Sequence, residues 1–388
     1  MNFESVHYCV HAVPFHIVTR YLLHTYGWKY QLREEPSLSL LVRYYADSLP
    51  DSYLALEKNF PQLCAHQEKS PLGPRFIIAV GLKELAQIIV FAATLRDATL
   101  SQDLIPDEKP ADFSLRGQIW PRETPKVMGI LNITPDSFFD GGKHYPLQDY
   151  AAVAEKMIEA GADIIDIGGE STRPGARKVP THEEIQRLTP VLRQIRTRFN
   201  IPISIDTVKP AVANVMFELG ADMINDISGL SAGEAMIQTI VKHKGSYCLM
   251  HTQGTPETMQ QAPHYSDVIA EIYLFFQQSL DQCARLGLSN QQILLDPGIG
   301  FGKTLEHNLD ILRFLSAYRS LPSLLLLGTS NKSFIGKILN ADVDDRLYGS
   351  LITQSQGLIS GATVFRVHEV RETLDALRMT DQYRGPQS

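Results

Sequence analysis

The chain has 388 residues, of which 44% are hydrophobic and 20% are charged, and its formal net charge at pH 7 is −7. This length exceeds the usual size of one domain, so one large domain with an appended segment is expected. The acidic balance, without a block of Lys and Arg, argues against a nucleic acid or an anionic membrane as partner and favours a small-molecule ligand.

The cysteines and the N-terminal residues bear on the cellular compartment. The chain has four cysteines, which lie far apart and form no C-x-x-C motif. This spacing argues against a zinc site or a disulfide framework and indicates a reducing, cytoplasmic setting. The first residues, MNFESVHY, lack the pattern of a signal peptide, and the most apolar stretch, residues 76–93, contains Lys83 and Glu84. We therefore expect no membrane span.

Residues 1–100 are expected to form a small N-terminal domain. They contain two aromatic-rich or apolar stretches, LVRYYADSLPDSYLALEKNF and FIIAVGLKELAQIIVFAATL, which can bury a small core. We interpret this segment as an α+β accessory domain of unknown function.

Residues 101–125 differ in composition from both neighbours. Four prolines stand here among Asp, Glu and Ser: Pro106, Pro110, Pro121 and Pro125. Proline lacks an amide hydrogen and disfavours both helix and ladder pairing. We expect a linker, followed by a second domain over residues 126–388.

Eight short apolar runs recur in this second domain: KVMGILNIT, ADIIDIGGE, IPISIDT, ADMINDISG, SYCLMHTQG, ILLDPGIG, SLLLLGTS and ATVFRVHE. Between them lie stretches with apolar residues at helical spacing, such as 149–160, 183–198, 209–219, 232–243 and 268–286. Alternating strands and helices of this number and length predict a (β/α)8 TIM barrel.

A doubly wound sheet is the structural alternative, and the ends of the runs discriminate between the two. A doubly wound sheet gathers its polar residues around one switch point, whereas a barrel places them at the C-terminal ends of all its strands. Nearly every run ends in a polar residue: Asn132, Glu170, Asp206, Asn225, Asp226, His251, Asp296, Ser330, Arg366 and His368. The pattern favours the barrel.

The motifs at these ends resemble those of dihydropteroate synthases, in the same order: MGILNITPDSFFDGG, DIIDIGGESTRPGA, ISIDT, INDISG, LMHTQGTPETMQ, LLDPGIGFGK, GTSNKSFIGKIL and RVHEV. The resemblance covers about residues 126–378. It implies a transferase of folate biosynthesis, a target of sulfonamides, that joins 7,8-dihydropterin-6-ylmethyl pyrophosphate to p-aminobenzoate and releases pyrophosphate. The family is commonly dimeric, so a homodimer is expected.

A pterin ring has one edge rich in N–H donors and another of acceptors, so its pocket needs carboxylates on one side and an amide or cation on the other. The resemblance assigns this pocket to Asp206, Asn225, Met250, Asp296, Lys332 and Arg366. It implies that Asp296 takes the ring donors, that Lys332 faces the carbonyl and N5, and that Met250 forms an apolar wall. An Asp at a strand end is also typical of a helix N-cap, as for Asp206.

The pyrophosphate needs cations and, as a rule, a magnesium ion with few protein ligands. Arg366 and His368 follow the last strand, where barrels commonly bind phosphate. The resemblance implies that Asn132 is the magnesium ligand. The alternative for Arg366 is a surface salt bridge with Glu369.

The carboxylate of p-aminobenzoate suits a helix N-terminus, which Ser333 provides at the start of SFIGKIL. The resemblance implies these contacts to p-aminobenzoate: Phe138, Thr172, Arg173, Pro174, Phe301 and Ser333. The nearby GFGKT string resembles the end of a phosphate-binding P-loop, but Pro297 stands where that motif requires glycine, so no nucleotide site is expected.

Catalysis is assigned by resemblance to Asp140, Arg173 and Lys332. Dissociative C–O cleavage leaves a cationic pterin methylene that the Asp140 carboxylate could stabilise. A neutral aromatic amine is already nucleophilic, so no strong base is needed. The Gly- and Pro-rich segments TPDSFFDGG and ESTRPGA follow the first two strands. Ordinary turn chemistry is the alternative for both, although it does not account for Arg173.

Three positions depart from the family pattern: Phe139 replaces the usual Ser, Thr252 the usual Met, and Asn331 the usual Arg. Loss of an Arg removes a cation and a planar stacking surface. Two alternatives therefore stay open. One is a degenerate pterin-binding paralogue without turnover, and the other is a pterin-dependent methyltransferase on the same barrel, which has no need of an anion site at residues 330–333.

Overall fold

The computed structural model of the protein describes ten stretches of the chain: residues 8–14, 38–45, 65–70, 73–81, 112–133, 149–171, 178–254, 258–260, 262–265 and 268–384. They belong to two compact units. The first unit contains β1 (Tyr8–Pro14), β2 (Leu38–Tyr45), β3 (Ala65–Ser70) and β4 (Gly73–Gly81). These strands form an antiparallel sheet in the order β1-β2-β4-β3. The helical part of the expected α+β domain lies outside the described residues.

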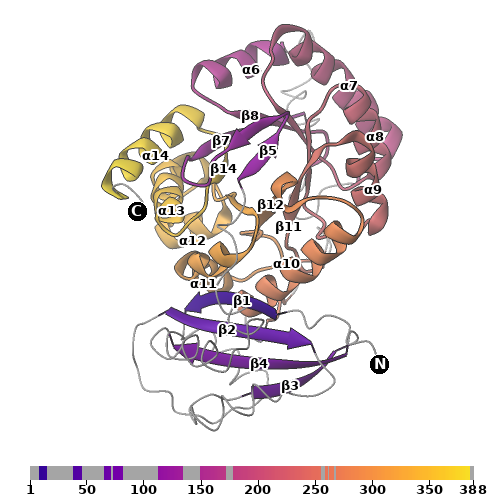
Figure 1. Ribbon diagram of the computed structural model, residues 1–388. Helices are drawn as coiled ribbons and strands as arrows, with labels where there is room; N and C mark the ends of the chain where they lie inside the picture. The colour runs from indigo at the N-terminus through magenta and orange to yellow at the C-terminus, as the bar shows by residue number, and fades with distance from the viewer. Residues whose placement is uncertain are drawn as a thin grey trace. The chain divides into compact units, whose positions relative to one another are not determined.

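The second unit is a closed barrel of parallel strands (Figure 1). Its strands are β7 (Lys126–Asn132), β8 (Ile164–Gly168), β9 (Ile203–Asp206), β10 (Met223–Asp226), β11 (Ser246–Met250), β12 (Ile293–Asp296), β13 (Leu324–Leu327) and β14 (Val364–Val367). The barrel closes where β14 pairs with β7. The eight predicted strands and the (β/α)8 barrel are confirmed. The continuous apolar runs form strands here because helices cover the outside of the barrel while side chains fill its interior.

Helices surround the barrel (Figure 1). They are α6 (Tyr150–Glu159), α7 (Thr181–Arg198), α8 (Pro210–Glu218), α9 (Glu234–His243), α10 (Val268–Arg285), α11 (Leu305–Arg313), α12 (Ser333–Leu339), α13 (Leu347–Ile359) and α14 (Val370–Arg384). Short 3-10 helices occupy Asn290–Gln292, Leu315–Ser320 and Val343–Asp345. Local sequence fixes several helix starts: the Asp149 side chain caps α6, and Thr304 with His307 forms a capping box at α11.

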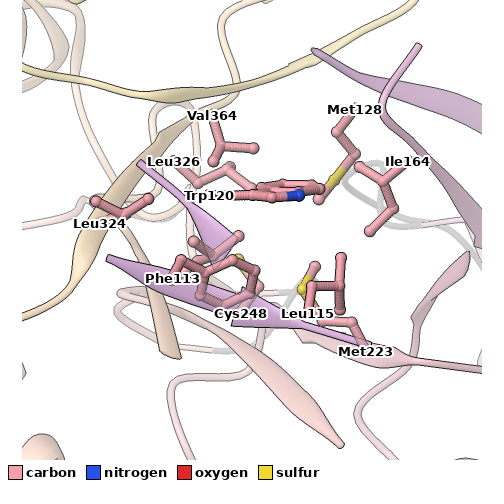
Figure 2. Packing of buried hydrophobic residues seen from close by; sticks show 11 residues of the cluster. Phe113, Leu115, Trp120, Met128, Ile164, Met223, Cys248, Leu324, Leu326 and Val364 are labelled. Atoms are coloured by element: carbon pink, nitrogen blue, oxygen red, sulfur yellow. The ribbon is translucent and has the colours of Figure 1, made fainter. Parts of the chain in front are cut away.

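A hairpin of β5 (Phe113–Leu115) and β6 (Gln118–Trp120) closes the N-terminal end of the barrel. Its turn places Arg116 and Gly117 at positive φ, as a two-residue hairpin turn requires. Phe113, Leu115 and Trp120 are buried in one cluster with residues from the beginnings of the strands, among them Met128, Ile164, Met223 and Val364 (Figure 2).

This hairpin lies inside the segment expected to be a linker. The expected absence of ladder pairing does not hold for residues 113–120. The prolines at 110, 121 and 125 flank the two strands and interrupt neither of them, so every ladder position keeps its amide hydrogen. Within the described part of the chain, no helix has the length and apolar character needed to cross a membrane.

Candidate active site

Polar side chains gather at the C-terminal rim of the barrel. Asp206 ends β9, Asn225 and Asp226 end β10, and Asp296 ends β12. Parallel strands in a closed barrel all end at the same rim, so these residues share one mouth although 90 residues separate the first from the last. Asp206, Asn225 and Asp296 are 8%, 2% and 6% exposed, so a ligand that binds them is largely enclosed.

The guanidinium of Arg366 lies between two carboxylates in this mouth. Its Nε is 2.7 Å from Asp166 Oδ2, and its Nη2 is 2.8 Å from Asp206 Oδ2. Asn225 Nδ2 donates to the same oxygen of Asp166 at 3.2 Å. The cluster thus connects β14 with β8, β9 and β10. The predicted alternative, a surface salt bridge between Arg366 and Glu369, is wrong because the carboxylates inside the barrel pair with this guanidinium.

Burial and charge shift the pKa values of this cluster in opposite directions. Burial raises the pKa of Asp206 to about 7, and the positive charge of Arg366 opposes that rise. For Arg366, burial alone would lower the pKa, but the charges of Asp166 and Asp206 raise it above its ordinary value. The guanidinium therefore stays charged between the two carboxylates.

Several buried polar atoms of the barrel interior have no partner among the described residues: Asp166 Oδ1, Asn225 Oδ1 and Ser204 Oγ. Asp296 Oδ1 accepts from the Gly298 amide at 2.8 Å, and burial raises the pKa of this carboxyl. Most buried polar atoms in folded proteins have a hydrogen-bond partner. Unpartnered oxygens at the base of a mouth therefore indicate a place for a ligand that carries N–H donors.

Lys332 enters the mouth from the start of α12. Its Nζ lies 4.1 Å from the centroid of the Phe301 ring, and its ammonium forms no hydrogen bond or ion pair with the described residues. Burial lowers the pKa of Lys332 to about 8, with Arg366 adding to the decrease and Asp296 opposing it. A half-buried ammonium with unused donors is suited to an acceptor on a ligand. Met250, 1% exposed, pairs in register with Asp296 and supplies an apolar surface nearby.

A second polar group surrounds Ser330, after β13. Ser330 Oγ lies 2.9 Å from His368 Nδ1 and 3.0 Å from Glu369 Oε2, and Asn331 Nδ2 donates to Glu369 Oε1 at 2.8 Å. Glu369 is thus bonded through both oxygens. His368 and Ser333 are exposed beside this group. Asn331 has a φ of 56°, a left-handed conformation that Asn tolerates better than most residues.

Asn132 ends β7 with an exposed side chain. A Cβ placed on Gly168 would lie 3.2 Å from Asn132 Oδ1 and 3.6 Å from Asp206 Cβ, so both side chains border this glycine. The remaining predicted site residues, Phe138, Asp140, Thr172, Arg173 and Pro174, lie outside the described residues, as does Phe139. Their assignments stay predictions.

The structure describes the residues on both sides of the segment 172–177. Glu170 Oε1 accepts from the Val179 amide at 2.8 Å, and Lys209 Nζ lies 2.6 Å from Glu170 Oε2. Lys209 also pairs with the fully buried Glu184. Glu170 therefore bonds to the chain that follows residues 172–177 and, through Lys209, to the neighbouring βα unit.

Sequence reasoning missed two charged residues of this region. Asp166 is 0% exposed and is the direct partner of Arg366. The sequence feature that marks Asp166 is its charge within the apolar run ADIIDIGG. A carboxylate in such a run is expected to have a buried partner. Lys303, 3% exposed, bonds to His251 and was considered only as part of a P-loop-like string.

Comparisons with known proteins identify the family of the chain. The family of pterin-binding enzymes matches residues 128–368. The dihydropteroate synthase of Escherichia coli is 47% identical over 257 residues, which are 66% of this chain and 91% of that protein. The dihydropteroate synthase of Synechocystis sp. is 44% identical over 263 residues, 68% of this chain and 91% of that protein.

Solved structures give the same result. The Yersinia pestis dihydropteroate synthase in complex with a sulfonamide drug has a TM-score of 0.66 and 41% identity, and the match covers 71% of this chain and all (100%) of that one. The Xanthomonas albilineans dihydropteroate synthase with 4-aminobenzoic acid has a TM-score of 0.66 and 36% identity, with coverage of 72% and 100%.

Proposed function

The chain belongs to the family of pterin-binding enzymes, and we infer from its similarity to the dihydropteroate synthases of this family that it is a dihydropteroate synthase. The reaction condenses 7,8-dihydropterin-6-ylmethyl pyrophosphate with p-aminobenzoate to give 7,8-dihydropteroate and pyrophosphate. The observation that carries this conclusion is the buried pairing of Arg366 with Asp166 and Asp206, beside a Lys332 ammonium that has unused donors. Carboxylates and cations then face one enclosed mouth, as a ring with a donor edge and an acceptor edge requires.

The pterin is proposed to bind inside this mouth. Asp296 would accept the N3–H and 2-amino donors, since its Oδ2 has no partner among the described residues. Asp206 and Asn225 would hold the other ring nitrogens. Lys332 would donate to the carbonyl and N5, and Met250 and Arg366 would border the ring faces. The unpartnered Asn225 Oδ1 supports this arrangement because it needs an N–H donor.

The pyrophosphate is proposed to bind to Arg366 and His368. Arg366 uses Nε and Nη2 for the two carboxylates, and its Nη1 donates no hydrogen bond to the described residues. His368 is exposed beside Ser330. Cations here would stabilise the charge that develops on the leaving group as the C–O bond breaks.

Magnesium is the proposed cofactor, with Asn132 as its protein ligand. The Asn132 carboxamide forms no hydrogen bond with the described residues and borders Gly168 near Asp206. No group of three or more potential ligands from His, Cys, Asp and Glu occurs in the described part of the chain. One hard oxygen donor fits Mg²⁺, which keeps several waters and binds substrate phosphates. When bound, the ion neutralises charge on the pyrophosphate.

The p-aminobenzoate is proposed to lie between Phe301 and Ser333, with its carboxylate at the Ser333 hydroxyl. Phe138, Thr172, Arg173 and Pro174 are the further proposed contacts. The C–O bond would break first, with pyrophosphate leaving with the bonding electrons. The amine nitrogen would then attack the cationic pterin methylene carbon and release one proton to water. Asp140 is proposed to stabilise positive charge at the methylene. Positioning of the neutral amine supplies much of the rate enhancement, and a strong base is not required.

We also propose a cytoplasmic location and a homodimer. Cys248 and Cys283 are free and buried, which suits a reducing compartment. Exposed apolar side chains occur along α13, where Tyr348, Ile352 and Ile359 are 76%, 69% and 53% exposed. Such a surface is suited to self-association. Light scattering on the purified protein tests the dimer, and a mass of one chain at micromolar concentration would contradict it.

The test of the function is product formation. Purified protein with both substrates and magnesium should form 7,8-dihydropteroate, detected by mass spectrometry, and a sulfonamide should compete with p-aminobenzoate. A protein that binds the pterin pyrophosphate without forming product would instead be a degenerate pterin-binding paralogue. Methyl transfer from a reduced folate to a corrinoid protein would identify the methyltransferase alternative.

A further inference from the structure

Residues 298–303, which follow β12 and are here called the 298–303 loop, have backbone groups that form hydrogen bonds with several side chains. The carbonyl oxygens of three consecutive residues each accept from a different side chain. Gln260 Nε2 donates to Gly300 O at 2.8 Å, Lys303 Nζ to Phe301 O at 2.9 Å, and Tyr265 OH to Gly302 O at 2.9 Å. The Gly300 amide donates to Asn308 Oδ1 at 2.8 Å. The backbone on both sides of Phe301 is therefore held from several directions.

The loop also lies tightly against the chain that follows β11. A Cβ on Gly298, at φ +70°, would be 2.0 Å from His251 O, and one on Gly302, at φ +59°, would be 2.5 Å from Gln253 O. Only glycine fits such an approach and such a conformation. This contact joins the segments that follow β11 and β12, the two strands that end in Met250 and Asp296.

Lys303 provides the central connection. It is 3% exposed, and its ammonium lies 3.2 Å from His251 Nδ1, 3.2 Å from His251 O and 2.9 Å from Phe301 O. All three contacts are to hydrogen-bond acceptors, and no ion pair with a carboxylate is formed among the described residues. Burial lowers the pKa of Lys303 to about 7 and that of His251 to about 2, so the imidazole is neutral and Nδ1 can accept.

Burying a lysine side-chain nitrogen without a carboxylate partner is costly, and an apolar residue of similar size would avoid that cost. Lys303 instead fixes the geometry of the loop, because its side-chain nitrogen bonds both to the Phe301 carbonyl and to His251, which follows β11. The Phe301 ring in turn lies 4.1 Å from Lys332 Nζ, a cation–π contact between the two walls of the mouth.

We propose that Lys303 is a positioning residue that fixes the Phe301 ring against Lys332 and so sets the binding site for the ring of p-aminobenzoate. This rests on the proposed function, in which Phe301 lines that site. Lys303 touches neither substrate in this account. Its removal should therefore weaken p-aminobenzoate more than the pterin, because Asp206 and Asn225 lie on β9 and β10, which Lys303 does not bond. Asp296 is bonded by the Gly298 amide and the Lys332 backbone by Thr329, and neither bond involves Lys303.

The test is the Lys303→Met variant of the full-length protein, assayed by pyrophosphate release with each substrate varied in turn. We expect the KM for p-aminobenzoate to rise about tenfold or more, since a displacement of about 1 Å can have effects of this size. Equilibrium affinity for the pterin pyrophosphate, measured without p-aminobenzoate, should stay within about twofold. Lys156→Met, at an exposed position on α6, is the matched control and should change neither quantity.

A double-mutant cycle with Phe301→Leu shows whether Lys303 acts through this ring. In the Phe301→Leu background, Lys303→Met should have little further effect on the KM for p-aminobenzoate. Additive effects of the two substitutions would overturn the proposal. So would a KM unchanged by Lys303→Met, or equal losses for both substrates accompanied by a lower Tm.

If Lys303→Met does not fold, Gln260→Ala decides, because Gln260 is exposed and its amide also holds the loop. A selective rise of about twofold or more in the KM for p-aminobenzoate supports the proposal, and no change overturns it. The outcome for the proposed function is read from the wild-type protein. Absence of aminobenzoate-dependent turnover there contradicts the function itself, whereas an active wild type with an unselective Lys303→Met contradicts only the positioning role.

Discussion

Arg366 Nε lies 2.7 Å from Oδ2 of Asp166, a carboxylate that is 0% exposed inside the second strand of the barrel. A charge in such a place is stable only with a partner and further hydrogen bonds. Asp206 provides a second partner for the guanidinium, and the Asn225 amide provides a further donor to Asp166. The base of the substrate mouth is therefore a charged cluster whose geometry depends on all four strands that contribute to it.

The first prediction concerns Asp166→Asn. The substitution keeps the shape of the side chain but removes one of two charged partners of Arg366, so we expect a loss of about 1–3 kcal/mol of stability in urea unfolding. The KM for the pterin pyrophosphate should rise because Arg366 and Asn225 are no longer fixed. Asp375→Asn, which affects an exposed pair with Arg371, is the matched control and should cost less than about 1 kcal/mol. Equal effects of the two variants would contradict the structural role given to Asp166.

The second prediction concerns the hairpin at the other end of the barrel. Trp120 is 3% exposed among the first residues of the strands (Figure 2), so Trp120→Ala should cost about 3–5 kcal/mol. The adjacent Ile119 is 58% exposed, and Ile119→Ala should stay within about 0.5 kcal/mol. Thermal and urea unfolding of both variants measure the difference. A Trp120→Ala protein as stable as Ile119→Ala would mean that the hairpin is not part of the barrel core.

The third prediction is a pH dependence. Burial lowers the pKa of Lys332 to about 8, so the ammonium is charged below that pH and neutral above it. If the charged form donates to the pterin, kcat/KM for the pterin pyrophosphate should fall as pH rises through about 8. In Lys332→Arg the guanidinium stays charged, so this alkaline decrease should move to higher pH even if kcat/KM is lower throughout. An unchanged alkaline limb in that variant would assign the titration to another group.

The fourth prediction concerns Asn331, which stands where the family usually has Arg. Its φ of 56° and its amide bond to Glu369 are separate contributions. Asn331→Gly keeps the conformation and loses the bond, whereas Asn331→Ala loses both and should be about 1 kcal/mol less stable than Asn331→Gly. Urea unfolding of the pair isolates the backbone contribution. Equal stability would show that the left-handed conformation imposes no strain on this residue.

The fifth prediction concerns magnesium. Asn132→Ala should raise the magnesium concentration needed for half-maximal activity, because the carboxamide oxygen is the proposed protein ligand. Binding of p-aminobenzoate should be less affected. A magnesium titration of both proteins after treatment with a chelator measures this shift. The same magnesium dependence in both would remove Asn132 from the metal site.

The barrel was predictable from the sequence because its strands are buried on both faces and read as continuous apolar runs, such as SLLLLG. The rim residues Asp206, Asn225 and Asp296 were predictable as well, since each is a polar residue that ends such a run. A closed barrel brings these ends together whatever their separation along the chain.

Other features depend on packing between distant segments. Asp166 lies inside a run and is explained only by Arg366, which is 200 residues away. Lys303 is explained by the carbonyl of His251 and by the close approach at Gly298, neither of which leaves a periodic pattern. The hairpin at residues 113–120 was not predicted, because the four prolines of residues 101–125 indicated a linker and each strand of the hairpin has only three residues.

The measurement that tests the central claim most directly is pyrophosphate release by the full-length protein with the pterin pyrophosphate and magnesium, with and without p-aminobenzoate. The Asp296→Asn variant is measured in parallel. Release that depends on p-aminobenzoate and is lost in Asp296→Asn is the predicted result. Absence of release from a wild-type protein that still binds the pterin pyrophosphate would contradict the synthase activity, and Asn331→Arg would then be the first variant to make.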